Sequence, residues 1–360
     1  MIAKAKVAIT DAVEANKVAG GGVFVHYDNI SERKADVFVD TDIRNRDGKS
    51  RNVVLLTELC DREGNVLKSA RRQVRLAPGE SRTVNQKMTV ENPNLWSPRA
   101  PYLYRVNSRV LDGSRPLDGG TTRIGIRKAE FRGAEGFYLN DKPYGQLIGA
   151  NRHQDFAYVG NAVPNSQQWR DAKKLRDAGC EIIRAAHYPQ DPAFMDACDE
   201  LGLFVIVATP GWQYWNKDPE FGRLAQENNR QMIRRDRNHP SVLVWEPILN
   251  ETRFPLDFSL EALAITREEF PYPGAPVAAG DLHSEGIADH YELIYGWPMD
   301  EGKAKQSIFT REFGENVDDW YAHNNNNRAS RSWGEHPQLV QALSLAESYG
   351  DMFNTSGQFV

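Results

Sequence analysis

The sequence predicts an antiparallel β-sandwich of about a hundred residues, followed by a (β/α)8 TIM barrel of the α/β class. Two observations support this. Residues 20–128 consist of short stretches in which apolar and polar residues alternate, the pattern of half-buried strands. From residue 147 onward, apolar strands instead alternate with amphipathic helices, as in a parallel sheet covered by helices. A length of 360 residues allows two domains, and we place them at 1–128 and 129–360.

Alternating stretches in the first domain are predicted to be the strands of the sandwich. They are residues 23–30, 35–43, 52–61, 73–78 and 103–112. Asn, Asp and Gly are frequent between them and supply turn conformations at low cost. These strands carry no convergent cluster of catalytic groups, so we expect this domain to be a structural spacer.

The barrel is predicted to begin with a strand over residues 147–153 and a helix over residues 166–179. One apolar stripe of that helix comprises Trp169, Ala172, Leu175 and Ala178, and Gly179 ends it. A strand over residues 182–188 follows. The next helix is bounded by an N-cap, a first-turn proline and a C-terminal glycine: Asp191, Pro192 and Gly202.

The rest of the chain continues the same rhythm. Further strands are expected at residues 203–210, 241–250, 275–281, 290–296 and 307–314, and further helices around residues 224–235, 260–269 and 337–350. Residues 358–360 have the character of a strand that has only begun. Seven strands with an eighth begun therefore predict a (β/α)8 TIM barrel that lacks its end.

Composition excludes several classes of protein. The formal net charge is −5, from 44 Lys and Arg against 49 Asp and Glu; without a basic face, nucleic acid is not an expected partner. No apolar run is long enough to span a membrane, and the first twenty residues lack the apolar core of a signal peptide. Three widely spaced cysteines form no disulfide or zinc pattern. The compartment, cytoplasmic or periplasmic, and a homo-oligomeric state stay open.

Polar side chains at the ends of the predicted barrel strands are the candidate site, because active sites of this fold lie at the C-terminal ends of the strands. Glu251 and Glu312 end the fourth and seventh strands, nearly opposite each other around the barrel. Glycosidic bond cleavage requires such a pair of carboxyl groups. Arg184, at the end of the second strand, would keep Glu312 ionised, and Asn250 would hold a sugar hydroxyl.

Three segments carry a family resemblance. IIRAAHYPQDPAFMDACDELGLFV (residues 182–205) and DRNHPSVLVWEPILNE (residues 236–251) resemble the two signatures of glycoside hydrolase family 2, and FTREFG (residues 309–314) resembles the motif around its nucleophile. The family includes β-galactosidases, β-glucuronidases and β-mannosidases. The resemblance covers nearly the whole chain and implies that the sandwich is immunoglobulin-like.

The resemblance implies a role for each candidate residue. Glu251 would be the acid/base and Glu312 the nucleophile of a retaining, exo-acting β-glycosidase, so the two carboxyls would lie about 5–5.5 Å apart. The substrate-binding residues would be His153, Arg184, His187, Asn250, Tyr295 and Trp297. Among them, Asn250 would contact the 2-hydroxyl and Tyr295 would hydrogen-bond the nucleophile. Glu251 would carry a proton while Glu312 is ionised.

The substrate expected first is a terminal β-galactoside, with β-glucuronides and β-mannosides as alternatives. Aromatic side chains follow several strand ends, which favours a cleft for an oligosaccharide or polysaccharide fragment: Trp212, Trp215 and Trp297. No metal or other cofactor is implied, because residues 208–211 lack the Glu-x-His by which some relatives bind magnesium. The lysine motif that β-glucuronidases use for the substrate carboxylate is not visible.

The sequence also departs from the family pattern. Glu246 and Pro247 follow Trp245, where the family usually has a small residue; because Glu246 precedes the strand end, we expect a structural role for it. The N-terminal jelly roll and the end of the barrel have no counterpart, so we expect this chain to be inactive or poorly active. Two alternatives stay open: a carbohydrate-binding protein without turnover, and a metal-dependent hydrolase that uses His153 and His187.

Overall fold

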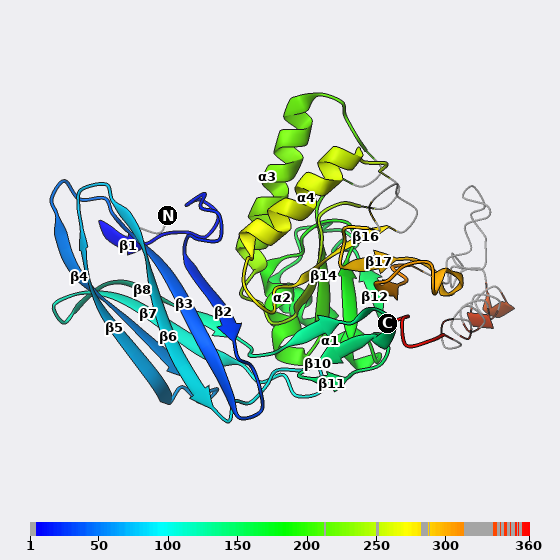
Figure 1. Ribbon diagram of the computed structural model, residues 1–360, viewed down its shortest axis with the longest axis horizontal. Coiled ribbons are helices and arrows are strands. Elements are labelled where there is room, and N and C mark those ends of the chain that lie inside the picture. The colour runs from blue at the N-terminus through cyan, green and yellow to red at the C-terminus, as the bar shows by residue number, and fades with distance from the viewer. Residues whose placement is uncertain are drawn as a thin grey trace.

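The computed structural model confirms a sandwich followed by a curled parallel sheet. It describes residues 5–211, 214–249, 252–281, 287, 289–312, 334–336, 339, 342–343, 346, 350, 352 and 355–360. Figure 1 shows the sandwich at one end of the molecule and the barrel strands at the other, with α3 and α4 on the outside. Among the described residues, no helix has both the length and the apolar character needed to cross a membrane.

The sandwich consists of two antiparallel sheets. In the first, β3 (Lys34–Asn45) pairs on one side with β1 (Val7–Ile9) and β2 (Val23–Asp28), and on the other with β6 (Ser81–Glu91). The second has the order β5 (Val66–Leu76), β4 (Arg51–Cys60), β7 (Tyr104–Asp112) and β8 (Arg115–Ile124). Alternate residues of β4 and β7 are buried between the sheets, which produces the period of two seen in the sequence.

All five predicted strands of the sandwich are present. Three further strands, β1, β6 and β8, were not predicted. In β6 the inward face includes the polar Gln86, whose Oε1 accepts a hydrogen bond from Thr57 at 2.6 Å. β8 has few buried positions. The apolar alternation of β6 is therefore interrupted at Gln86, although its Val84, Met88 and Val90 are buried in the core. In β8 the alternation is weak.

The barrel strands form one parallel sheet in chain order. They are β12 (Gly149–Arg152), β13 (Ile182–Ala185), β14 (Phe204–Ala208), β15 (Val242–Glu246), β16 (Val277–Asp281), β17 (Leu293–Tyr295) and β18 (Ser307–Phe309). Every pair of neighbours is parallel. Ile308 of β18 also forms a parallel bridge with Phe359, where the sequence predicts that an eighth strand begins.

The helices lie where the amphipathic pattern predicts them. They are α1 (Asn165–Asp177), α2 (Pro192–Leu201), α3 (Pro219–Asp236) and α4 (Leu256–Glu269), with short 3-10 turns η1 (Gly133–Glu135) and η2 (Pro298–Asp300). Asp191 caps α2 by accepting a hydrogen bond from the backbone N–H of Ala193, and Gly202 ends it with φ 76°. The predicted helix over residues 337–350 lies largely outside the described residues.

The buried face of α1 differs from the predicted stripe. Gln168 and Ala172 are buried, whereas Trp169 is 40% exposed and Ala178 is also exposed. Gln168 is inside because its Oε1 accepts a hydrogen bond from Arg152 at 2.7 Å. A hydrogen-bonded polar side chain can replace an apolar one at such a position, and hydrophobic periodicity alone does not reveal it.

A small antiparallel sheet closes the lower end of the barrel. It consists of β9 (Ala129–Phe131), β10 (Phe137–Leu139) and β11 (Lys142–Pro143). Phe137 and Leu139 share one core cluster with Ile182 and Phe204, the first residues of β13 and β14. The strand starts are therefore covered, and the opposite rim is left for the site.

The sandwich is fixed to the barrel by buried polar contacts. Arg127 donates to the carbonyl of Pro240 at 2.6 Å, and the indole N–H of Trp96 donates to the carbonyl of Asp199 at 3.0 Å. Asn238 accepts from the backbone N–H of Val25 at 2.9 Å. The division between residues 128 and 129 stays a prediction.

Candidate active site

A cavity of about 760 Å³ runs along β12, β13 and β18, from Gly149 and Ile182 at the strand starts to Glu312, which follows β18. Arg184, Asn151 and Glu312 line it together with apolar side chains such as Ile206 and Phe309. A cavity of this size is typical of small-molecule sites. The structure thus brings two of the predicted site residues, Arg184 and Glu312, to one opening.

Arg184 and Glu312 are in direct contact. Nη1 of Arg184 lies 2.9 Å from Oε1 of Glu312, although the two residues are 128 positions apart in the sequence. Arg184 is only 3% exposed, so little water screens the attraction. A guanidinium at this distance favours the ionised form of a carboxylate, which is the state that a nucleophile requires.

Glu246 occupies the other side of the same guanidinium. Its two oxygens accept bonds from Nε and Nη2 of Arg184 at 2.8 and 2.7 Å, a bidentate pair. Glu246 has no exposed surface. Burial alone would lower the pKa of Arg184. The charge and hydrogen bonds of Glu246 outweigh burial, so the pKa of Arg184 lies above its ordinary value. Arg184 is therefore fixed in position as well as charge.

His187 lies beside the same carboxylate. Its Nε2 is 3.9 Å from Oε1 of Glu312, and its ring centroid is 5.6 Å from that of the exposed His153. Burial, followed by the charges of Arg184, His153 and Arg311, lowers the pKa of His187 to about 4. At neutral pH this imidazole is uncharged, so it can accept or donate a hydrogen bond without adding charge.

Tyr295 and Trp297, the aromatic candidates, lie at the end of β17. Tyr295 is 3% exposed, and its ring centroid is 6.0 Å from Cζ of Arg184 and 5.3 Å from Cζ of Arg311. Burial, with a smaller contribution from Glu246, raises the pKa of its phenol. Trp297 is 42% exposed. The predicted bond from Tyr295 to the nucleophile and the sugar contact of Trp297 stay predictions.

Asn250 and Glu251, the predicted sugar contact and acid/base, lie outside the described residues, as does Trp212. The segment is described up to Leu249 and again from Thr252, both about 5% exposed. The expected separation of the two carboxyl groups therefore stays a prediction.

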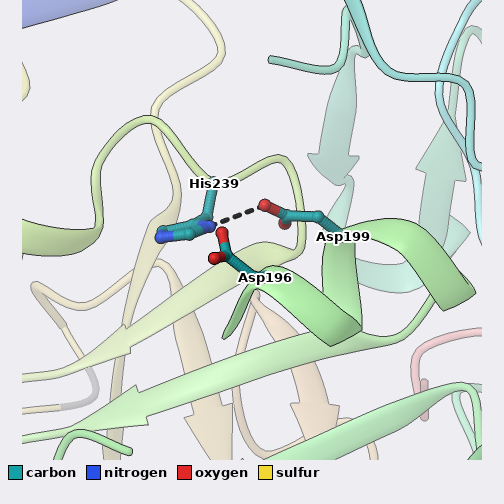
Figure 2. Close-up of side chains that lie close together, drawn as sticks. All are labelled: Asp196, Asp199 and His239. Atoms are coloured by element: carbon teal, nitrogen blue, oxygen red, sulfur yellow. Dashed lines mark hydrogen bonds and ion pairs between the residues drawn. The ribbon is translucent and has the colours of Figure 1, made fainter. Parts of the chain in front are cut away.

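One group of potential metal ligands occurs among the described residues, outside the candidate site. Asp196, Asp199 and His239 have ligand atoms within 4.8 Å of one another, and Figure 2 shows their side chains converging between α2 and the turn before β15. This turn lies at the start of the strand, at the opposite rim from Glu312.

Ion pairing explains this group without a metal. Asp196 is 2.6 Å from Arg123, and Nδ1 of His239 is 2.6 Å from Asp199 (Figure 2). Burial would lower the pKa of His239, but Asp199 outweighs it and raises the pKa to about 9. A protonated imidazole has no lone pair for a metal.

Two residues of the site were not predicted to be there. Glu246 was expected to be structural because the predicted strand continued beyond it, whereas β15 ends at Glu246. Arg311, which lines the cavity, was not predicted. The sequence contains a signal for each. Glu246 is the charged last residue of a buried strand that is otherwise apolar, and such a residue is paired when buried. Arg311 directly precedes Glu312 at the strand end.

Fold and site together define a (β/α)8-barrel protein with a charged Arg184–Glu312 pair near the C-terminal ends of its strands. Two family models match this chain. "Glycosyl hydrolases family 2" matches residues 18–127, and "Glycosyl hydrolases family 2, TIM barrel domain" matches residues 130–267. The chain belongs to glycoside hydrolase family 2.

Curated relatives support the same family. A β-galactosidase of Thermoanaerobacter pseudethanolicus is 37% identical over 277 residues, which is 76% of this chain and 36% of the relative. A β-glucuronidase of Formosa agariphila is 30% identical over 228 residues, 62% of this chain and 23% of the relative. The chain therefore spans about a third of the length of the first of these relatives and less of the second.

Solved structures share the fold. Bacteroides uniformis β-glucuronidase 2, covalently bound to cyclophellitol-6-carboxylate aziridine, has a TM-score of 0.79 at 22% identity, over 95% of this chain and 46% of that one. A family 2 member from Bacteroides cellulosilyticus has a TM-score of 0.74 at 25% identity, over 85% of this chain and 42% of that one.

Proposed function

We propose that this chain carries the site of a retaining β-glycosidase that hydrolyses terminal β-linked sugars. The observation that carries the proposal is the contact between Glu312 and Arg184, which both line a cavity large enough for a monosaccharide. A carboxylate that is kept ionised, half-buried and open to a cavity is equipped to attack an anomeric carbon.

The reaction takes place in two displacements. Glu312 attacks the anomeric carbon while Glu251 gives its proton to the departing glycosidic oxygen, so a covalent glycosyl ester forms and the aglycone leaves as an alcohol. Glu251, now ionised, then takes a proton from water, and the resulting hydroxide displaces Glu312. Two inversions retain the β configuration. No metal or redox partner is required for either step.

Sugar contacts are assigned to the other residues around the cavity. His153 and His187 would bind hydroxyl groups of the sugar, Asn250 its 2-hydroxyl, and the exposed ring of Trp297 would stack against an apolar sugar face. Tyr295 would hold the nucleophile. A 2-hydroxyl bond that strengthens in the oxocarbenium-like transition state would contribute to kcat rather than to binding alone.

The proposed substrate is a β-galactoside. This choice rests on two relatives named β-galactosidase that are 37% and 34% identical. Relatives named β-glucuronidase are 30% identical or slightly more, so β-glucuronides are the first alternative and β-mannosides the second.

The test is hydrolysis of aryl β-galactoside, β-glucuronide, β-mannoside and β-glucoside by the 360-residue chain. Glu312→Gln should lower kcat at least about a thousandfold, while Glu220→Gln, an exposed carboxylate paired with Arg223 on α3, should leave it unchanged. NMR should detect the β-anomer as the first product, and a chelator should have no effect.

The outcomes separate the candidate functions. Sugar binding without hydrolysis, unaffected by Glu312→Gln, would show a carbohydrate-binding protein instead. Hydrolysis that a chelator abolishes would favour a metal-dependent enzyme, and an α-anomer as first product would contradict the retaining mechanism.

A further inference from the structure

Arg184 lies between two carboxylates that come from different strands. Glu246 ends β15 and Glu312 follows β18, while Arg184 belongs to β13. We propose that Glu246 is a positioning residue of the glycosidase site, which holds Arg184 and thereby sets the orientation and charge of the nucleophile Glu312. This inference rests on the proposed function.

The geometry of the guanidinium supports the positioning role. Nε and Nη2 of Arg184 both donate to Glu246, at 2.8 and 2.7 Å. A planar group held by two parallel bonds cannot rotate about its Cδ–Nε bond. Its remaining nitrogen, Nη1, therefore points in a fixed direction, and Oε1 of Glu312 lies 2.9 Å along it.

Burial makes this arrangement difficult to replace. Arg184 is 3% exposed and Glu246 is fully buried. Without Glu246, Nε and Nη2 of Arg184 would lose the carboxylate that accepts from both of them. A buried charge that loses its partner destabilises its surroundings strongly, so Arg184 would move toward Glu312 or water.

Charge balance gives Glu246 a second effect. One positive guanidinium serves two carboxylates, so the three side chains together carry one negative charge. Without the charge of Glu246, the positive charge of Arg184 would no longer be divided between these two carboxylates. A carboxylate held by an undivided positive charge is a weaker nucleophile, and it stabilises the positive charge that develops at the anomeric carbon less well.

The expected pH signature follows from these charges. In the part of the chain that the structure describes, the charged and titratable groups around Glu312 include Arg184, His187, Glu246, Tyr295, Arg311 and His153. Removal of the Glu246 charge leaves Arg184 undivided, so Glu312 should become harder to protonate. The acidic limb of kcat/KM should move to lower pH, whereas the basic limb, which reports Glu251, should stay in place.

The test compares pH profiles of three variants of the full chain on the best aryl β-glycoside. Glu246→Gln should lower kcat/KM about tenfold to a hundredfold and move the acidic limb down by about half a pH unit or more. Glu246→Asp keeps the charge but shortens the side chain, so kcat should fall while the limb stays in place.

The matched control is Glu269→Gln. Glu269 is also fully buried and is held in a bidentate pair by Arg234, at 3.1 and 2.7 Å, but it lies on α4 away from the cavity. The Glu269→Gln chain should lose stability like the Glu246→Gln chain, but its pH profile of kcat/KM should be that of the wild type. A purely structural role would give both variants the same unchanged limbs.

The inference is overturned by an unmoved acidic limb in a folded Glu246→Gln chain. If that variant does not fold, Glu246→Asp decides, because unchanged kcat in it would contradict positioning. Because this chain is expected to be at best poorly active, the assays use a high enzyme concentration. A wild-type chain that still hydrolyses no glycoside would overturn the proposed function and this inference together. An active wild type with an unresponsive Glu246 variant would overturn only the inference.

Discussion

Nδ1 of His239 lies 2.6 Å from Oδ2 of Asp199, and this pair joins α2 to the turn before β15. The other oxygen of Asp199 accepts the backbone N–H of Ser241 at 3.0 Å, and its carbonyl accepts the indole N–H of Trp96 from the sandwich. Asp199 is 1% exposed. One buried carboxylate thus links a helix, a barrel strand and the other half of the chain.

Stability should depend on the protonation of His239. Its pKa in the folded chain is about 9, because Asp199 outweighs burial, whereas an unfolded histidine has a pKa of about 6.5. Below that value both states hold the proton and the stabilisation is complete. As the pH rises toward 9 the unfolded state releases its proton first, so the free energy of unfolding should decrease.

Urea denaturation at pH 6, 7.5 and 9 measures this decrease. His239→Asn should be less stable than the wild type at pH 6 and should show a flatter dependence on pH. Equal slopes in the two chains would show that the Asp199 pair is not the source.

Gly202 is expected to tolerate no side chain. It ends α2 with φ 76°, and a Cβ there would lie 2.3 Å from the carbonyl oxygen of Pro98. Gly79 has a similar φ of 74° with nothing within 4 Å. Gly79→Ala should cost about 1–2 kcal/mol for the left-handed backbone. Gly202→Ala should cost about 1–3 kcal/mol more because of the overlap.

Chemical denaturation of the two alanine variants gives the difference directly. Because the backbone term is common to both, the excess in Gly202→Ala isolates the contact with Pro98. Equal losses of stability would mean that the segment around Pro98 can move away at no cost.

Arg127 should be important for holding the sandwich on the barrel. It is 7% exposed, and it donates to the carbonyls of Pro240, at 2.6 Å, and Val242. Arg127→Met keeps much of the volume but leaves two buried carbonyls without these donors. The expected loss is about 2–4 kcal/mol, with earlier proteolysis between the two halves. A thermal midpoint within about 1 °C of the wild type would contradict this role.

Much of the barrel could be predicted because its signals are local. Asp191, Pro192 and Gly202 mark the ends of α2, and the structure confirms each. The strand β6 was missed because Gln86 interrupts its apolar alternation and its partner β3 is distant in sequence, as in the pairing of Val84 with Thr41. The strand β8 forms a hairpin with β7 but has few buried residues to mark it. Long-range pairing leaves no mark in a short window of sequence.

The site shows the same limit. The contact of Arg184 with Glu312 could be expected, since both end barrel strands and strand ends converge on one rim. The place of Glu246 could not be derived, because every residue of β15 is buried. In a strand buried on both faces, the sequence does not show which side chains point into the barrel.

His187 should stay uncharged over the working pH range. Burial, then Arg184, His153 and Arg311, lower its pKa to about 4, below the value of about 6.5 in an unfolded chain. As the pH falls from 6.5 toward 4 the unfolded state binds the proton first, so the free energy of unfolding should decrease. His187→Gln should lack that decrease.

NMR titration of the histidine side chains tests this directly, with His187→Gln to assign the resonance. The signal of His187 should not shift between pH 8 and 5, and the acidic limb of kcat/KM should be the same in His187→Gln as in the wild type, although kcat falls. A midpoint above pH 6 would contradict the prediction. It would mean that the attraction of Glu312, 3.9 Å away, outweighs burial and both arginines, and His187 would then supply a positive charge to the site.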